Sequence, residues 1–196
     1  MIAALFVETK GCYQGLPNVD PWDIHRDAMK YDGPHPVVAH PPCARWCQMA
    51  SMVEAIYGYK KGDDGGAFAS ALASVRKWGG VLEHPANTAA FAAHGLARPP
   101  RRGWQRDMCG GWSCQVSQAA YEHRAQKMTW LYAYRCELPT LKWGKRDGTA
   151  YVSFANYNNG KAKVVERMGR RDALSTPHAF RDLLIAMAET ANGAQK

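Results

Sequence analysis

The sequence predicts a single α/β domain over residues 1–196, with a mostly parallel sheet flanked by helices. Short apolar runs of strand-forming residues alternate with amphipathic helical segments, a pattern typical of parallel βαβ units. The chain has 196 residues, of which 46% are hydrophobic, enough for one buried core and too few for two ordinary domains. Two of the expected strands end at prolines, and ligands of such sheets bind where parallel strands end.

The first half of the chain supplies three of the expected strands. Asp20 is a plausible helix cap with Pro21 in the first turn, and the pair Pro41-Pro42 ends a strand because proline cannot donate a ladder hydrogen bond. The expected elements are a strand at 3–8, helices at 19–31, 43–59 and 66–78, and strands at 33–40 and 81–85.

The second half is richer in arginine, glycine and tryptophan and gives weaker patterns. We expect a helix at 87–96, strands at 112–116 and 128–134, one hairpin within 144–173, and a closing helix capped by Ser175 or Thr176. An apolar stripe on that last helix predicts its core face: Phe180, Leu183, Leu184 and Met187.

The formal charge of +8, from 25 Lys and Arg against 17 Asp and Glu, favours a polyanionic partner. Residues 98–127 and 144–172 are expected to form basic loop regions that contact nucleic acid; a merely basic protein is the alternative. No run of about 18 apolar residues exists, so no membrane span is expected. The apolar N-terminus lacks a preceding basic region, so it reads as a strand, and a cytoplasmic location is expected.

Chemistry is predicted at the two proline-terminated strand ends. Cys43 follows one, Glu83 and His84 lie at the other, and we expect all three to face one ligand. A thiol and a carboxylic acid in one pocket suit a pyrimidine base, because a thiolate can add to C6 while the acid binds N3. Arg45 and an expected helix N-terminus would lower the pKa of the Cys43 thiol.

Further polar residues near these strand ends are candidate substrate contacts. His40 and Pro42 precede Cys43, and a basic cluster follows the expected strand at 112–116. A solvated basic surface and a structural histidine are the alternatives. The candidate substrate-binding residues are His40, Pro42, His84, Gln118, His123, Arg124 and Lys127.

A zinc or iron-sulfur nucleic-acid-binding site is an alternative use of the cysteines. Cys43-x3-Cys47 and Cys109-x4-Cys114 could supply thiolates, with His40, His84 or His123 as further donors. These spacings are looser than the Cys-x2-Cys of metal knuckles, so we assign no metal ligand.

The motifs "HPPC" and "LEHP", with a helix between them, resemble the Pro-Cys and Glu-Asn-Val/Pro motifs of cytosine-C5 DNA methyltransferases, and the whole chain looks like a small phage-type protein of this kind. The resemblance implies a Rossmann-like, methyltransferase-like fold, with Cys43 as nucleophile and Glu83 on the cytosine edge. It also implies S-adenosylmethionine as donor, near Val7, Glu8, Asp20 and Asp23. The family's glycine-rich loop is absent, so another one-carbon donor, or none, is the alternative.

These observations together predict an enzyme that modifies a pyrimidine base, in DNA or in a nucleotide, within a bacterial host cell. Cys43, Glu83 and Arg45 are its expected catalytic residues. The alternative is a non-catalytic DNA-binding or anti-restriction protein that retains a methyltransferase-like fold.

Overall fold

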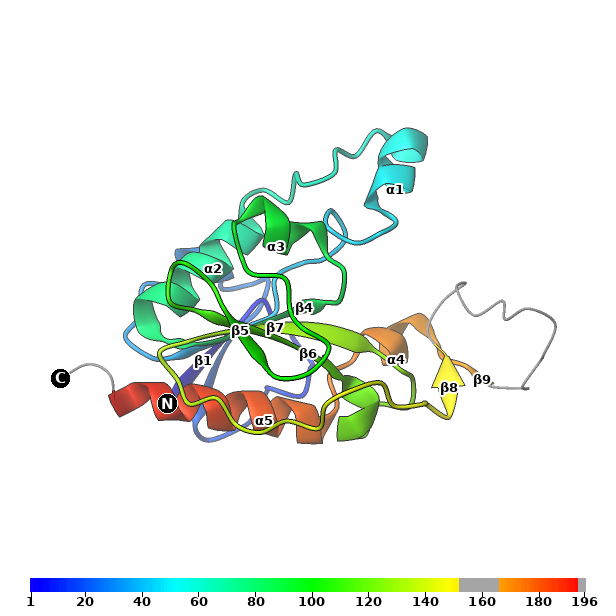
Figure 1. Ribbon diagram of the computed structural model, residues 1–196. Coiled ribbons are helices and arrows are strands. Elements are labelled where there is room, and N and C mark those ends of the chain that lie inside the picture. The colour runs from blue at the N-terminus through cyan, green and yellow to red at the C-terminus, as the bar shows by residue number, and fades with distance from the viewer. Residues whose placement is uncertain (152–165, 194–196) are drawn as a thin grey trace.

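A seven-stranded mixed sheet forms the centre of the computed structural model, which describes residues 1–151 and 166–193. The strand order is β2-β1-β3-β4-β7-β6-β5, and the pair β8-β9 lies outside this sheet (Figure 1). The strands are β1 Ile2–Leu5, β2 Val19–Trp22, β3 Val37–Ala39, β4 Gly80–Pro85, β5 Trp104–Arg106, β6 Trp112–Ser117, β7 Met128–Tyr134, β8 Ala150–Tyr151 and β9 Glu166–Arg167.

The sheet has a parallel half and an antiparallel half. Strands β2, β1, β3 and β4 pair in parallel, whereas β7, β6 and β5 pair in antiparallel fashion with their neighbours. The expected mostly parallel sheet is therefore only half right. The short turns that link β5, β6 and β7 permit only antiparallel pairing, because a parallel connection needs a long crossover.

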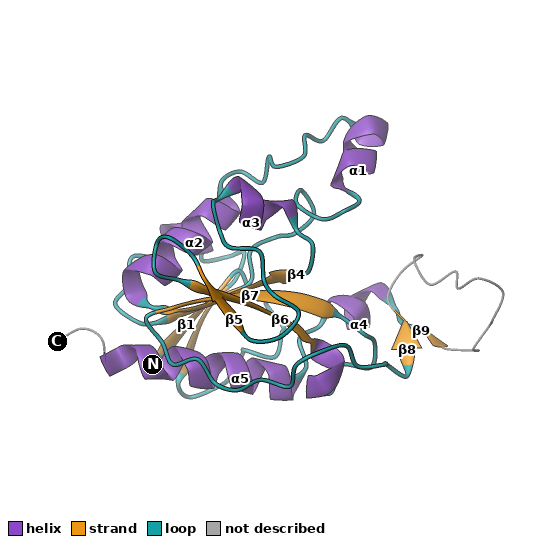
Figure 2. Cartoon of the chain, viewed as in Figure 1, coloured by secondary structure: helices purple, strands orange, loops and turns teal. Residues whose placement is uncertain are grey.

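Helices cover both faces of the sheet (Figures 1 and 2). Helix α2 packs on one face through Phe68, Ala71 and Val75, and α5 packs on the other through Phe180 and Leu184. The helices are α1 Ala50–Tyr57, α2 Ala67–Trp78, α3 Ala89–Ala93, α4 Arg170–Leu174 and α5 His178–Glu189, with short 3-10 turns η1 Ala28–Lys30, η2 Gln118–Tyr121 and η3 Thr190–Gly193. None of the helices in the described part of the chain has the length and apolar character that crossing a bilayer requires.

Helix α1 stands away from this layered body, at the end of a long excursion between β3 and α2 (Figure 1). Its first residue, Ala50, is buried, and the rest of the helix is largely exposed. The excursion begins directly after Cys43, so it borders the edge of the sheet where the parallel strands end.

Several expected elements differ from those found. Residues 19–22 form strand β2 instead of a capped helix, and Pro21 is tolerated there because β2 is an edge strand. The helix expected from Cys43 begins only at Ala50, after a series of turns. Pro177, rather than Ser175 or Thr176, occupies the cap position of α5.

The hairpin expected within 144–173 is also not what the described residues form. Strands β8 and β9 pair in parallel, whereas the two strands of a hairpin are antiparallel. Residues 152–165 of that expected basic region lie outside the described residues. The other expected basic loop, 98–127, contains β5, β6 and η2.

Candidate functional site

A chain of hydrogen bonds crosses the sheet where its parallel strands end. The Tyr13 hydroxyl lies 2.8 Å from Nε2 of His40, and Nδ1 of His40 lies 3.0 Å from Oε2 of Glu83. Nε2 of Gln118 donates to Oε1 of Glu83 at 3.3 Å and to the Thr129 hydroxyl at 2.8 Å. Five segments far apart in the sequence thus meet through polar side chains that are almost fully shielded from water.

Strand alternation explains why these side chains meet on one face. Val38 and Val81 belong to the core beneath α5, and the side chains two positions further along each strand point the same way. His40 and Glu83 occupy those two positions, just past the ends of the apolar runs. They therefore lie side by side on the α5 face, at the carboxyl edge of β3 and β4.

Glu83 is an ionised carboxylate in this arrangement. Burial by itself would raise its pKa, but the hydrogen bond and charge of His40, helped by Lys127, hold the pKa of Glu83 below its usual value. An ionised carboxylate only accepts hydrogen bonds, so Nδ1 of His40 donates to Glu83, and the Tyr13 hydroxyl is hydrogen-bonded to Nε2 on the other side of the ring.

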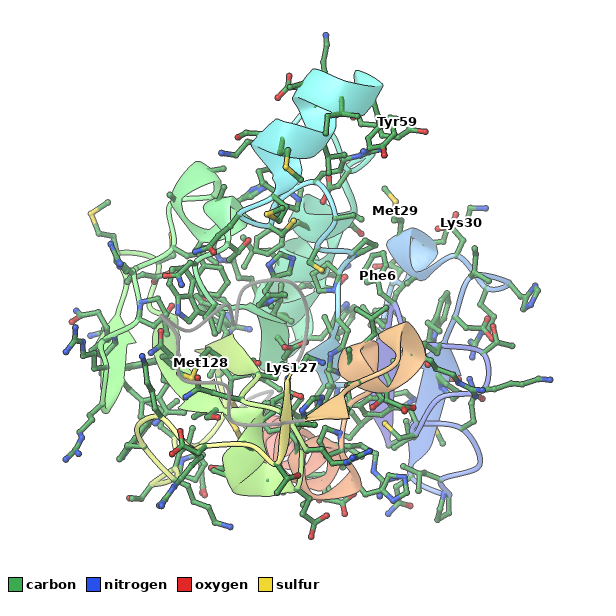
Figure 3. The ribbon with its side chains drawn as sticks, turned by 90° about the vertical axis from the view of Figure 1, so that its right-hand side faces the viewer. Phe6, Met29, Lys30, Tyr59, Lys127 and Met128 are labelled. Carbon is green, nitrogen blue, oxygen red and sulfur yellow. The ribbon has the colours of Figure 1, made fainter. Side chains whose placement is uncertain are left out.

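Cys43 and Lys127 complete the site at the same edge. Burial, followed by the negative charge of Glu83 and the neighbouring Cys47, raises the pKa of the Cys43 thiol, and Lys127 acts in the opposite direction. Burial lowers the pKa of Lys127, whereas Glu83, Cys43, Glu8 and Cys12 raise it. The Lys127 ammonium therefore lies within electrostatic range of two thiols and two carboxylates. Figure 3 shows Lys127 on the same side of the molecule as Phe6, which follows β1.

Lys127, and not Arg45, is the cation that acts on Cys43. The Arg45 guanidinium instead stacks over the Tyr59 ring, 4.1 Å from its centroid. The expected helix N-terminus is also absent at Cys43, because the following residues form turns and α1 starts seven residues later. The two features that were expected to acidify the thiol are thus not the ones found, and Cys43 is protonated at neutral pH in the free protein.

His84 does not join Cys43 and Glu83. Successive side chains of a strand point to opposite faces, so His84 follows Leu82 into the core beneath α2, where its ring meets the edge of Phe68. Burial lowers the pKa of His84 to about 4, although the charge of Glu83 and the nearby Pro42 carbonyl oppose that shift. His84 is a neutral core residue, fully buried.

The remaining expected substrate contacts divide into buried and exposed residues. Gln118 is fully buried and holds Glu83, and His123 is buried with Nδ1 at 2.9 Å from the Ala125 carbonyl. Pro42 and Arg124 are exposed near the edge. The expected contact cluster after residue 117 is thus mostly an internal support of the site, and not a solvated basic surface.

The residues expected to hold S-adenosylmethionine do not form a cofactor cradle. Asp20 is already paired with Arg26 and accepts a 2.8 Å hydrogen bond from the Trp22 indole. Val7 is buried, Glu8 is exposed, and Asp23 accepts from the backbone nitrogen of residue 25. The crossover from β1 to β2, residues 6–18, contains no helix, so no helix N-terminus faces the position of a bound cofactor. This half of the sheet does not fit the expected donor.

The cysteines do not converge as a metal site would require. Cys114 is buried within β6, and Cys109 is exposed in the β5–β6 turn, at the opposite edge of the sheet from Cys43 and Cys47. Among residues 1–151 and 166–193, no group of three or more His, Cys, Asp or Glu side chains is arranged to hold an ion.

Tyr13 and Thr129 are site residues that sequence reasoning missed. Tyr13 lies in the irregular connection between β1 and β2, where no periodicity reveals which way a side chain points. Its hydroxyl is nevertheless hydrogen-bonded to His40, at the end of β3. Phe6 offers a further signal at this edge, because a non-glycine residue with φ of 59° directly after β1 marks backbone strain of the kind that clusters at functional sites.

Two open hollows lie at the other edge of the sheet, with volumes of about 610 and 670 Å³. They share Arg106 and Gly110, and one of them is lined by Arg135 at the end of β7. The other is lined by Asp107, whose buried side chain pairs with Arg76 at 3.6 Å, and Arg76 donates to the Tyr132 hydroxyl at 3.0 Å. The carboxyl edge next to the strand-order reversal at β1 and β3, however, is where ligands of such sheets bind. We therefore assign the site to the carboxyl edge.

Comparison of the chain with protein-family models, with curated proteins and with solved structures gave no match, so the site rests on its own geometry.

Proposed function

We propose that the protein modifies a pyrimidine base in nucleic acid by adding the Cys43 thiol to C6 of the ring. The observation that carries the proposal is the hydrogen-bonded chain through Glu83 at the carboxyl edge of the sheet, with Cys43 and Lys127 within electrostatic range of that carboxylate. The Lys127 ammonium is held in place by the carbonyls of Leu174 and Ser175, at 3.0 and 3.2 Å. A thiol, a carboxylate that can take its proton and a cation that stabilises the resulting thiolate are groups that suit covalent catalysis on a weakly electrophilic ring.

The addition step balances within this set of residues. The Cys43 thiol gives its proton to the Glu83 carboxylate, which passes it to N3 of the base as the sulfur bonds to C6. The C5–C6 π electrons form a double bond between C4 and C5, and the C4–N3 π electrons bind the proton at N3, so C5 becomes nucleophilic and can take a proton from water, which leaves hydroxide. That hydroxide then takes the original C5 proton, the C5–C6 double bond forms again as the sulfur leaves as thiolate, and the N3 proton returns through Glu83 to the Cys43 sulfur. His40 and Gln118 position Glu83 throughout, since each contacts one carboxylate oxygen.

The partner is proposed to be DNA, and the finer fold to be Rossmann-like, as the motif resemblance implies. Support for the fold comes from the order β2-β1-β3, in which the chain moves first to one side of β1 and then to the other. Ligands of doubly wound sheets bind at such a reversal. The net charge of +8 supports a polyanionic partner.

No step is assigned to S-adenosylmethionine, because the residues around β1 and β2 do not fit it. The reaction is therefore proposed to begin with C6 addition whatever group is transferred afterwards. A phage-encoded base-modifying enzyme working inside a bacterial host agrees with the chemistry and the charge.

The proposal is tested by trapping the adduct. An oligonucleotide that contains 2-pyrimidinone in place of cytosine lacks the 4-amino group, so its C6 is more electrophilic and the thiol adduct accumulates without a donor. Intact-mass spectrometry is expected to find a protein–DNA adduct that is absent from Cys43→Ser. A parallel reaction with 5-fluorocytosine tests the donor. An adduct that forms only with S-adenosylmethionine would overturn the conclusion that the residues around β1 and β2 do not fit that cofactor.

A non-catalytic DNA-binding protein is the second candidate, and the raised pKa of Cys43 is the observation that favours it. If neither base gives an adduct while Cys43→Ser binds DNA as tightly as the unaltered protein, this second function replaces the first.

A further inference from the structure

The excursion that carries α1 begins next to Cys43 and holds a row of three planar side chains, two exposed tyrosines and one partly buried arginine. We refer to residues 45–61, between the two ends of this excursion, as the arm. The Arg45 guanidinium lies 4.1 Å from the centroid of the Tyr59 ring, and the Tyr59 ring stacks with that of Tyr57 at 6.4 Å and 29°. Tyr57 is 67% exposed and Tyr59 is 54% exposed, so the row keeps broad faces open to solvent.

Hydrogen bonds fix the two ends of the arm to each other, so the row of planar side chains is held by an ordered segment. The buried Trp46 donates its indole hydrogen to Asp64 at 2.7 Å, and the backbone nitrogen of Gly62 donates to the Arg45 carbonyl at 2.8 Å. These contacts close the excursion into a stem next to Cys43. A side chain that is already ordered loses less entropy when a ligand binds.

The charge of the arm matches a polyanion. Arg45, Lys60 and Lys61 carry three positive charges, and Glu54 is the single acidic residue in this stretch. The Glu54 carboxylate is partly used by accepting from the backbone nitrogen of Lys61 at 3.3 Å. Figure 3 shows Tyr59 at the top of the view, with Phe6 and Lys127, which border the candidate site, below it in the body of the molecule.

We propose that the arm is a stacking platform for unpaired nucleotides next to the target base, which makes single-stranded or locally unpaired nucleic acid the preferred substrate. Aromatic rings and arginine planes that track a strand, with cations for its phosphates, are how proteins hold single strands without reading their sequence. A duplex keeps its bases stacked on one another, so it offers the row no open base face. The inference deepens the proposed function, in that both take nucleic acid at this edge of the sheet.

Fluorescence anisotropy with a labelled single-stranded oligodeoxycytidine and with its duplex tests the platform. The binding is measured in the Cys43→Ser background, so that no chemistry contributes. Tyr59→Leu is expected to weaken single-strand binding about tenfold, with a much smaller effect on the duplex. Arg45→Lys keeps the charge and removes the plane, so it is expected to weaken binding without changing the salt dependence.

Ile56→Ala is the matched control, because Ile56 is 60% exposed on α1, within the same arm, and has no planar group. Its single-strand affinity is expected to stay within about twofold of the unaltered protein. The platform would be overturned if Tyr59→Leu bound the single strand as tightly as the unaltered protein, or if it lost as much affinity for the duplex as for the single strand. It would also be overturned if Ile56→Ala lost as much single-strand affinity as Tyr59→Leu. Self-association through the arm in sedimentation would overturn it as well.

The outcome is separable from that of the proposed chemistry. Single-strand binding that depends on Tyr59, without any Cys43 adduct, would uphold the platform and reject C6 addition. An adduct that forms equally well on a duplex and in Tyr59→Leu would uphold C6 addition by Cys43 and reject the platform.

Discussion

Replacing His40 by alanine tests the hydrogen-bonded chain more severely than any other single change. The substitution removes a bond to the Glu83 carboxylate and a bond to the Tyr13 hydroxyl, both of which are buried. A bond to a charged group contributes about 1.5–3 kcal/mol and a neutral one about 1 kcal/mol. We therefore expect His40→Ala to lower the free energy of unfolding at pH 7 by about 2.5–4 kcal/mol.

The cost of His40→Ala also depends on pH, with a sign that follows from Glu83. In the unaltered protein the pKa of Glu83 is lowered by folding, so its ionised form stabilises the fold above the unfolded value of about 4.3, and this stability is lost as the pH falls through the folded pKa. Without His40, burial prevails and raises the folded pKa above the unfolded value, so the charge becomes a penalty at neutral pH. The difference between the two proteins should therefore shrink from pH 7 to pH 4.

Urea unfolding at both pH values measures this difference, with Tyr13→Phe as the control. That variant removes only the hydroxyl and should cost about 1 kcal/mol at either pH. A cost for His40→Ala below about 1 kcal/mol at pH 7, or the same cost at pH 4 and pH 7, would refute the reasoning.

Three further predictions concern the surroundings of the site. Lys127→Met should slow alkylation of Cys43 by iodoacetamide by about threefold to tenfold, because the thiol pKa rises when that cation is lost, whereas Arg45→Met should leave the rate nearly unchanged. The pKa of His84 is about 4 in the folded protein and about 6.5 in the unfolded chain, so the unaltered protein should lose about 3 kcal/mol of stability as the pH falls from 6.5 to 4. Urea unfolding of His84→Leu should not show this loss. Gly80→Ala should cost more than about 3 kcal/mol in thermal or urea unfolding, because φ is 120° and the added methyl would overlap the neighbouring strand's backbone; a variant of near-normal stability would contradict the register of β3 and β4.

Local chemistry made part of the fold predictable from the sequence. The helix at 66–78 and the closing helix were expected from apolar residues at spacings of three and four, and α2 and α5 bury those residues apart from Leu183, which is only partly buried. The strand at 81–85 followed from a short apolar run stopped by Pro85. Where the local pattern was ambiguous, pairing with another strand determined the secondary structure. Residues 19–22 include residues typical of a helix cap, yet they pair with β1 as an edge strand.

The placement of Cys43 and Glu83 at neighbouring strand ends could be predicted from the sequence, but the hydrogen bonds that join Glu83 to other segments could not. Strand ends marked by prolines pointed to Cys43 and Glu83, and His40 was expected nearby. The reversal of direction at each residue of a strand separates Glu83 from His84, and this could have been read from the sequence. The roles of Tyr13 and Lys127 could not, because both depend on loops and on an antiparallel half-sheet whose packing no local pattern encodes.

Hydrogen exchange at C5 of cytosine is the measurement that tests C6 addition most directly, since it needs no donor. An unlabelled oligodeoxycytidine is incubated with the protein in D₂O, returned to H₂O so that amino deuterons are lost, and weighed by mass spectrometry. We expect deuterium to be retained at C5 with the unaltered protein, and none above background with Cys43→Ser. Exchange that persists in Cys43→Ser, or its absence in the unaltered protein under conditions where the oligonucleotide is bound, would contradict the assignment of Cys43 as the nucleophile.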